Sequence, residues 1–340
     1  MISYAMLLCA GRFRARVAII RTLALLLTAF VVLDTNPATG TELARRAQDQ
    51  VWLVSTRDMA VNCEAAENPD AWTVHYLDEN GKWLPGDVPT LLAWDTHFDQ
   101  TIVFVHGNRI ERGQDRYEGL TTYRALVPSD APQRVRFIIF SWPSGRIGGA
   151  LRDFREKAWR TVPAAYHLAW LVSRFDPQVQ LDFVGYSYGA RIVTGALHLV
   201  GGGSLNSHQL DASRPVDARV VLIAAASDRD WLLPGGLHER APSQMNHLLL
   251  LTNCCDPALK WYHLLDRCDN PIALGRWGLP TGALFESVAQ VESCEWVGRN
   301  HDLHLYLQSD ALMSLSWQAL TRDRPAEVSH EVLRPLAVHQ

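Results

Sequence analysis

The amino-acid sequence has 340 residues, of which 48% are hydrophobic and 20% are charged. This composition is typical of an ordered globular protein with a large core, and it excludes an intrinsically disordered chain. The formal net charge is −4; because residues 1–33 hold four arginines and no acidic residue, the remainder carries −8. That charge argues against nucleic acid or an anionic membrane as a partner.

The N-terminus has the pattern of an export signal. Four arginines within positions 12–21 precede twelve uncharged residues at 22–33. Such an apolar segment is of signal-peptide length and too short to span a bilayer comfortably. We expect residues 1–33 to be a signal peptide or N-terminal anchor and 34–49 to be a linker, in a protein exported to the periplasm, the cell envelope or the medium. A cytoplasmic protein with an N-terminal extension is the alternative.

From about residue 50 to 320, apolar runs alternate with stretches of helical pattern. Buried strands are predicted at 101–105, 135–143, 181–184, 219–225 and 248–253, with a last strand-like piece at 292–297. Helices are predicted at about 148–175, 190–197 and 303–320. This alternation predicts an α/β fold whose mostly parallel sheet has helices on both faces. We therefore expect one domain over residues 50–320 and a C-terminal tail over 321–340.

The first of these strands ends in a loop that begins His-Gly-Asn at 106–108. A loop at this place in an α/β sheet can offer backbone N–H groups to a developing oxyanion. We expect an oxyanion hole made by the backbone amides of Asn108 and Tyr188. His106 can serve a structural role within its loop or a catalytic one.

A G-x-S-x-G motif, Gly-Tyr-Ser-Tyr-Gly at 185–189, lies between a predicted strand and a predicted helix. In that context the motif is a nucleophile elbow, in which a strained turn presents the serine hydroxyl at the end of the sheet. The glycines let the backbone pass without a Cβ clash. Ser187 is therefore the candidate nucleophile.

A serine nucleophile needs a base and an acid that orients the base. Asp256 follows a predicted strand, and His301 precedes the last predicted helix. The chain order Ser187, Asp256, His301 is the order expected of an α/β-hydrolase sheet.

Three alternatives bear on these assignments. Asp228 lies at the end of the preceding strand and is the alternative acid, with Asp230 a weaker one. His304 is the alternative base. His301 and His304 also spell H-x-x-H, but no third ligand lies at an obvious spacing, so we expect no metal site.

Together, H-G-N at 106–108, F-S-W-P at 140–143 and G-Y-S-x-G at 185–189 make the chain resemble the α/β-hydrolase superfamily. More narrowly, it resembles a bacterial hydrolase-like family of largely unknown function that carries these three motifs. The loops at 253–259 and 300–301 are similar to that family's acid and histidine loops. The resemblance spans about residues 50–320 and implies the fold and a catalytic apparatus without a substrate.

Six cysteines are too few for a disulfide scaffold in a chain of this length. If Cys9 is removed with a signal peptide, an odd number stays, which implies at least one free thiol or an intermolecular bond. Cys255 and Cys268 are candidates for a bridge near the acid loop. No C-x-x-C pair, phosphate loop or dinucleotide fingerprint is present, so we expect no cofactor.

These observations favour a serine hydrolase that cleaves an ester or related acyl bond of a small molecule, with a carboxylesterase-like mechanism. A lipase, a thioesterase and an acyltransferase are related alternatives. An exported binding protein that retains the fold without catalysis is the alternative from another class. Trp231, Trp261, Tyr262 and Trp277 either line an apolar acyl site or cover the edge of the sheet.

Overall fold

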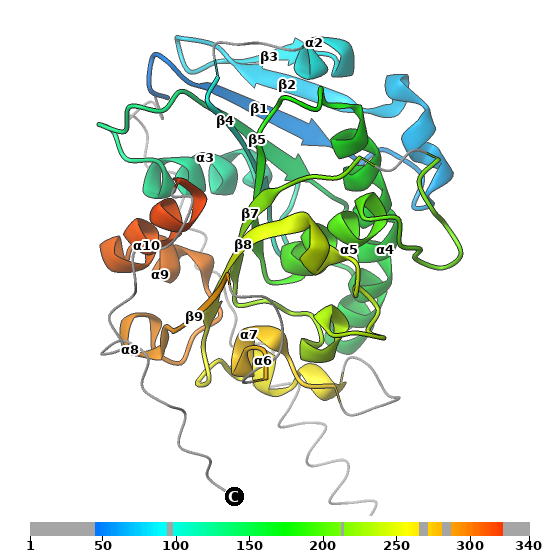
Figure 1. Ribbon diagram of the computed structural model, residues 1–340, viewed down its shortest axis with the longest axis vertical. Helices are drawn as coiled ribbons and strands as arrows, with labels where there is room; N and C mark the ends of the chain where they lie inside the picture. Colours follow the sequence, from blue (N-terminus) through cyan, green and yellow to red (C-terminus); the bar gives the residue numbers. More distant parts are fainter. Residues whose placement is uncertain (1–44, 94–97, 212–213, 265–270, 281–286, 322–340) are drawn as a thin grey trace, which may run out of the picture.

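The computed structural model describes residues 45–93, 98–211, 214–264, 271–280 and 287–321. Within these ranges the chain forms a nine-stranded sheet with helices packed against it (Figure 1). The expected signal peptide and nearly all of the expected C-terminal tail lie outside the described residues.

The strands follow the order β3-β2-β1-β5-β4-β6-β7-β8-β9 across the sheet. Neighbouring strands from β1 to β9 in that order run parallel, whereas β1–β2 and β2–β3 are antiparallel pairs. The strands are β1 (Gln50–Ser55), β2 (Thr73–Leu77), β3 (Trp83–Gly86), β4 (Gln100–Val105), β5 (Val135–Ser141), β6 (Leu181–Tyr186), β7 (Ala218–Ile223), β8 (Met245–Thr252) and β9 (Val288–Glu292).

Helices cover both faces of this sheet. On one side α4 packs on α5, which contacts β4 and β6; on the other, α10 contacts β7 and β8 and α3 contacts β5 (Figure 1). The helices are α2 (Val88–Leu92), α3 (Gln114–Leu126), α4 (Ala150–Arg174), α5 (Tyr188–Val200), α6 (Pro257–Lys260), α7 (Leu274–Trp277), α8 (Cys294–Val297), α9 (Leu303–Leu307) and α10 (Asp310–Thr321). No helix among the described residues is long and apolar enough to cross a membrane.

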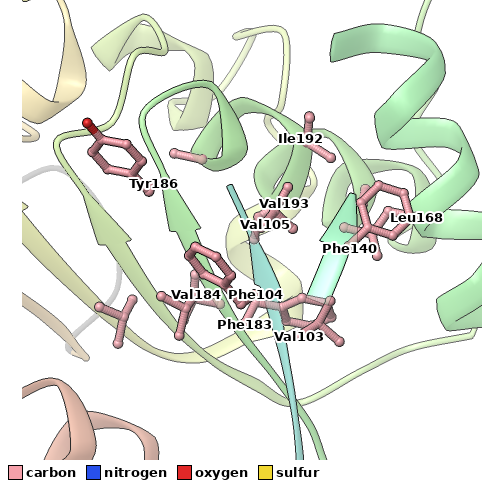
Figure 2. Packing of buried hydrophobic residues seen from close by; sticks show 14 of the residues in the cluster. Val103, Phe104, Val105, Phe140, Leu168, Phe183, Val184, Tyr186, Ile192 and Val193 are labelled. Atoms are coloured by element: carbon pink, nitrogen blue, oxygen red, sulfur yellow. The ribbon is translucent and has the colours of Figure 1, made fainter. Parts of the chain in front are cut away.

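The core lies in the middle of the sheet. Every residue of β4, β5 and β6 is buried, as expected for parallel strands covered on both faces. Figure 2 shows buried side chains of this core from the strands and from α4 and α5, including Phe104, Phe140, Leu168, Val184 and Ile192.

The strand order reverses next to β4. The chain passes from β4 to β5 on one side of it and then to β6 on its other side. In open α/β sheets ligands bind beyond the carboxyl ends of the strands at such a switch point. The residues that follow β4 and β6 therefore meet at the place where this architecture puts a site.

The structure confirms the predicted α/β class and the mostly parallel sheet. The last predicted strand, at 292–297, is wrong in position: β9 is Val288–Glu292, and the next residues form α8. Ser293 ends the strand because its backbone, with φ −100° and ψ 2°, leaves the extended conformation just before α8.

The single helix predicted at 303–320 is also wrong, because α9 ends at Leu307 and α10 begins at Asp310. Ser309 separates the two helices; its side-chain oxygen accepts a 3.4 Å bond from Leu312 N, which is the N-cap arrangement.

The expected linker over 34–49 is folded at its C-terminal end. The Asp49 carboxylate is buried and accepts bonds from Arg46, from the Tyr123 hydroxyl and from the Val135 amide. These bonds fasten the chain to α3 and β5 just before β1 begins.

Candidate active site

Ser187 occupies a strained turn between β6 and α5. Its φ of 53° and ψ of −116° are unusual for a residue with a Cβ atom. The turn is held because Ser187 N donates to Ile223 O at 3.0 Å and Ser187 O accepts from Ala226 N at 3.1 Å. A Cβ at Gly189 would overlap the Val105 carbonyl, so only glycine allows this approach. This is the elbow geometry that the motif predicts.

The three candidate catalytic side chains lie in hydrogen-bond contact. Ser187 Oγ is 2.9 Å from His301 Nε2, and His301 Nδ1 is 2.5 Å from Asp256 Oδ2. Because a carboxylate only accepts, Nδ1 carries the proton toward Asp256 and Nε2 faces the serine as an acceptor. The histidine is thus in the tautomer that can take a proton from Ser187.

The Asp256 carboxylate is completely buried and is held by the backbone. Its Oδ1 accepts from the amides of Ala258 and Leu259 at 2.8 and 3.0 Å, so the residue also N-caps the short helix α6. The two oxygens of this carboxylate therefore have different partners. Oδ1 caps the turn that begins at the Asp-Pro pair, and Oδ2 contacts His301.

The alternative residues lie elsewhere. The carboxylate of Asp228 caps the short 3₁₀ helix Arg229–Leu232 by accepting from Asp230 N at 3.4 Å. The Asp230 side chain is at the surface. His304 lies within α9, and its ring is 6.0 Å from that of Tyr117. The structure therefore brings Asp256 and His301 to Ser187, and neither Asp228 nor His304.

The loop after β4 lies directly against the elbow. A Cβ added at Gly107 would come within 2.8 Å of the Tyr186 ring and 3.2 Å of Ser187 Cβ. His106 Nδ1 is 2.9 Å from the Gly107 carbonyl, which belongs to the peptide that carries the Asn108 N–H. In a trans peptide the two groups point in opposite directions, so the Asn108 N–H is turned away from His106. The Tyr188 N–H, at the first position of α5, has no acceptor within its helix.

A buried charge network fixes His106, and no local pattern in the sequence indicates it. Arg57 Nη2 is 3.3 Å from His106 Nε2, and Arg57 Nε donates to Asp115 at 3.1 Å and to Ser141 at 2.6 Å. Because a guanidinium can only donate, Nε2 accepts and Nδ1 holds the ring proton that reaches Gly107. Burial, together with the Arg57 charge, lowers the pKa of His106 to about 3. His106 is thus a neutral positioning group.

A second carboxylate holds the other end of the same loop. Asp153 of α4 is buried, accepts from Asn108 Nδ2 at 3.3 Å, and pairs with Arg109 at 3.0 Å. It also accepts from Ile147 N at 3.0 Å and lies 3.7 Å from the Lys157 ammonium. Two buried carboxylates therefore hold the loop. Asp115 acts on one end through Arg57, and Asp153 contacts the other end directly.

The histidine loop is attached to the elbow strand as well. The Tyr186 hydroxyl donates to the His301 carbonyl, and the two rings lie 5.5 Å apart. This bond joins the residue before the candidate nucleophile to the candidate base.

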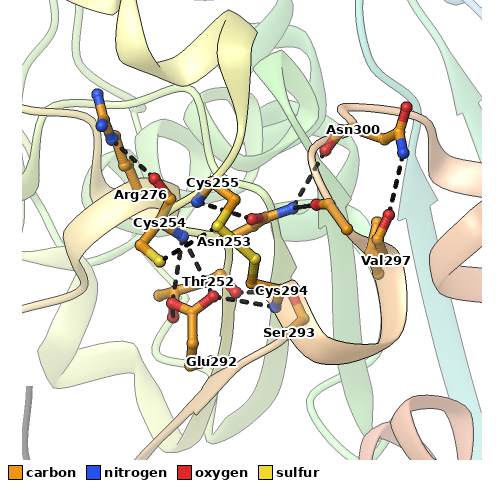
Figure 3. The surroundings of a disulfide bond; sticks show 11 residues. Thr252, Asn253, Cys254, Cys255, Arg276, Glu292, Ser293, Cys294, Val297 and Asn300 are labelled. Atoms are coloured by element: carbon orange, nitrogen blue, oxygen red, sulfur yellow. Dashed lines mark hydrogen bonds between the residues drawn. A yellow bond between two sulfur atoms is a disulfide. The ribbon is translucent and has the colours of Figure 1, made fainter.

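The predicted Cys255–Cys268 bridge is wrong: Cys255 is bonded to Cys294 (Figure 3). Cys268 lies outside the described residues. The pairing follows from the sheet, since Thr252 of β8 is paired with Glu292 of β9 and the two cysteines come shortly after these residues. Cys63 and Cys254 are free thiols.

The four aromatic residues considered for an acyl site divide into two groups. Trp261 and Trp277 are 40% and 43% exposed, whereas Tyr262 is buried and Trp231 is partly buried. The Trp231 ring lies 4.5 Å from the Arg191 guanidinium of α5. Trp231 thus packs next to the helix that begins at the elbow.

A comparison of the sequence with protein-family models found no match, and a comparison with curated protein sequences found none. The chemistry of the site therefore has to follow from its own geometry.

Proposed function

We propose that the chain is a serine hydrolase that cleaves an ester or related acyl bond of a small molecule through an acyl-enzyme intermediate. The observation that carries the proposal is the continuous contact from Ser187 through His301 to Asp256, at 2.9 and 2.5 Å. The strand-order reversal, the elbow and the order of these residues along the chain also support an α/β-hydrolase type of fold.

In the first half of the reaction, His301 Nε2 accepts the proton of Ser187 as Oγ attacks the substrate carbonyl carbon. Asp256 keeps the ring in the required tautomer and stabilises the imidazolium without accepting its proton. The backbone amides of Tyr188 and Asn108 are the proposed donors to the tetrahedral oxyanion. The tetrahedral intermediate then collapses, and His301 returns the proton to the leaving alcohol.

In the second half, His301 takes a proton from water, which attacks the acyl carbon. Collapse releases the carboxylic acid and restores Ser187. No cofactor is needed for either half.

Labelling with a fluorophosphonate tests this mechanism, because Ser187 Oγ displaces fluoride only when a base activates it. We expect labelling of the wild-type protein at Ser187, its loss in Ser187→Ala and His301→Ala, and its retention in the matched control His304→Ala. Peptide mapping identifies the modified residue, and circular dichroism checks that each variant is folded. Absence of labelling in folded wild-type protein would contradict the mechanism and favour a binding role.

We also propose that the protein is exported. The N-terminal pattern supports this, and so does the Cys255–Cys294 disulfide, since disulfides persist mainly in oxidising compartments. Fractionation of cells that express the full chain tests it; a protein found only in the cytoplasm with both cysteines reduced would overturn it.

A further inference from the structure

Arg191 is a buried cation in α5, one helical turn after the candidate nucleophile. Its side chain forms no hydrogen bond and no ion pair with another residue of the described chain, although the residue is only 9% exposed and its Nε is buried. Burial of an unpaired charge is costly, and arginine is rarely buried unless a carboxylate or a phosphate pairs with it. A guanidinium in this position therefore indicates an anionic partner from outside the described chain.

The Arg191 guanidinium lies near the N-terminus of α5, where the elbow is. Its Cζ is 5.4 Å from the centre of the Tyr188 ring. Side chains of a helix lean toward its N-terminus, and positions three apart share a face, so this contact is the expected one. Tyr188 directly follows Ser187, and its N–H is a proposed donor to the oxyanion. The positive charge is therefore held next to the residues that would react.

Aromatic rings hold the guanidinium in place. Arg191 Cζ is 4.5 Å from the centre of the Trp231 ring, and the buried His238 ring packs edge-on against the same indole at 4.7 Å. His238 Nδ1 is in turn 2.8 Å from the hydroxyl of Thr194 of α5. Stacking on rings orients a guanidinium while it leaves the N–H edge free, and that edge is the one that binds an anion.

The acidic residues of the neighbouring elements have other partners or lie at the surface. Asp153 of α4 pairs with Arg109 at 3.0 Å, and the carboxylate of Asp228 caps the 3₁₀ helix that follows it. The Asp230 side chain is exposed. Within the described chain, the charge of Arg109 is therefore neutralised and the charge of Arg191 is not.

We propose that Arg191 binds an anionic group of the substrate, so that the ester cleaved at Ser187 carries a carboxylate near its scissile carbonyl. This inference rests on the proposed hydrolase function and adds the class of its substrate. A guanidinium offers parallel N–H donors that match the two oxygens of a carboxylate. Half-esters of dicarboxylic acids are the simplest molecules of this class. Binding of their free carboxylate would position the ester carbonyl for attack.

Pairs of esters that differ only at the far end test this charge preference. Monoethyl succinate, adipate and suberate are compared with ethyl butyrate, hexanoate and octanoate, in which a methyl group replaces the carboxylate. The acid released is titrated at constant neutral pH. We expect a higher kcat/KM for the anionic member of at least one pair. Arg191→Met should reduce this preference by about 10- to 100-fold, the range for a hydrogen bond to a charged group.

Two further variants and the melting temperature separate a binding role from a structural one. Arg191→Lys should keep part of the preference, because it keeps the charge without the paired donors. Arg240→Met is the matched control; it removes the same charge from an exposed position and should leave the preference unchanged. Arg191→Met removes a buried cation that no described carboxylate neutralises, so its melting temperature should not fall. A preference that is absent from the wild type, or unchanged in folded Arg191→Met, would overturn the proposal.

A binding measurement distinguishes this inference from the proposed hydrolysis. Ser187→Ala lacks the nucleophile, so calorimetry with the same half-esters reports binding alone. Binding to Ser187→Ala that is lost when Arg191→Met is added would support the anion site even where no ester is cleaved. Equal hydrolysis of neutral and anionic esters, together with no difference in binding between these two variants, would support the hydrolase and contradict the role of Arg191.

Discussion

The loops after β4 and β8 both contribute to the candidate site, but different interactions hold them. The β4 loop is fixed by buried charges, with Arg57 and Asp115 behind His106 and Asp153 behind Asn108. The β8 loop is fixed by a disulfide and by backbone amides that donate to carboxylates. His106, which orients a backbone N–H donor, is therefore held by a buried ion pair, whereas the acid is held by a covalent bond and by hydrogen bonds from backbone amides.

The largest expected effect comes from the acid of the β8 loop. Asp256→Asn keeps the size of the side chain but presents an amide to His301, which favours the wrong tautomer. We expect kcat for a model ester to fall by about 10⁴-fold while the fold is kept. Asp228→Asn is the matched control and should stay within about tenfold of wild type, because that carboxylate only caps a short helix. A comparable loss in both variants would remove the distinction between the two acids.

The next effect tests the charges behind the β4 loop. Arg57→Met leaves the buried Asp115 carboxylate without its cation, and unpairing such a charge costs about 3–5 kcal/mol of unfolding free energy. Urea denaturation measures this loss. Arg112→Met is the control, since its pair with Asp58 is exposed and should contribute no more than about 1 kcal/mol.

Where Arg57→Met is folded, kcat should fall more than KM rises, because His106 loses the donor that fixes its tautomer. An unchanged kcat would show that the orientation of the Gly107–Asn108 peptide does not depend on Arg57.

Removal of the disulfide should affect stability more than chemistry. Cys255 and Cys294 are 39 residues apart, and a loop of that length corresponds to about 4 kcal/mol in the chain-entropy model. Replacing both cysteines by serine should lower the melting temperature. Asp256 should stay near His301, because Glu292 accepts from the backbone amides of residues 254 and 294 and Asn253 Nδ2 donates to the carbonyls of Gly298 and Asn300. A fall in kcat as large as that of Asp256→Asn in a folded double variant would show that the covalent link positions the acid.

The last expected effect concerns Glu118 of α3 and is spread over several pH units. Its carboxyl is buried, and burial, with the nearby Asp302 and Asp115 charges, raises its pKa from 4.5 to about 8. The unfolded chain loses this proton at lower pH than the folded one. The wild-type protein should therefore lose stability as pH rises from about 4.5 to about 8, at up to about 1.4 kcal/mol per pH unit.

Glu118→Gln removes this titration. The melting temperature of the variant relative to wild type should rise between these pH values and level off above them. A difference that does not change with pH would mean that Glu118 titrates in the ordinary range.

The sequence allowed the elbow to be predicted because its determinants are local. Gly185, Ser187 and Gly189 lie within five residues, and the strand before them and the helix after them carry their own patterns. Asp256 and His301 could be placed as well, since each lies in a loop next to a recognisable element. The sequence favours His301 over His304 because His301 precedes the helix, and the structure places the His301 ring against Ser187 and the His304 ring beside Tyr117.

Other parts of the site depend on pairing between distant segments. Arg57 reaches Ser141 only because β1 runs beside β5 with Ser55 opposite Ser141. Strands β1 to β3 were not predicted. Polar residues and glycine interrupt the apolar residues of β2 and β3, whereas the apolar run of β1 is like that of β4 and was not recognised. The Cys255–Cys294 bond likewise follows from the register of β8 and β9, which no local pattern reveals.

The distance along the chain between the candidate catalytic residues has a consequence for folding kinetics. Ser187 and His301 are 114 residues apart, and Asp256 and His301 are 45 apart. Contacts of such high sequence separation require closure of long loops, and they slow folding. The contact between Ser187 and His301 can form only after the segment beyond β9 has docked. In a refolding experiment, fluorophosphonate labelling of Ser187 should therefore return after the helical secondary structure.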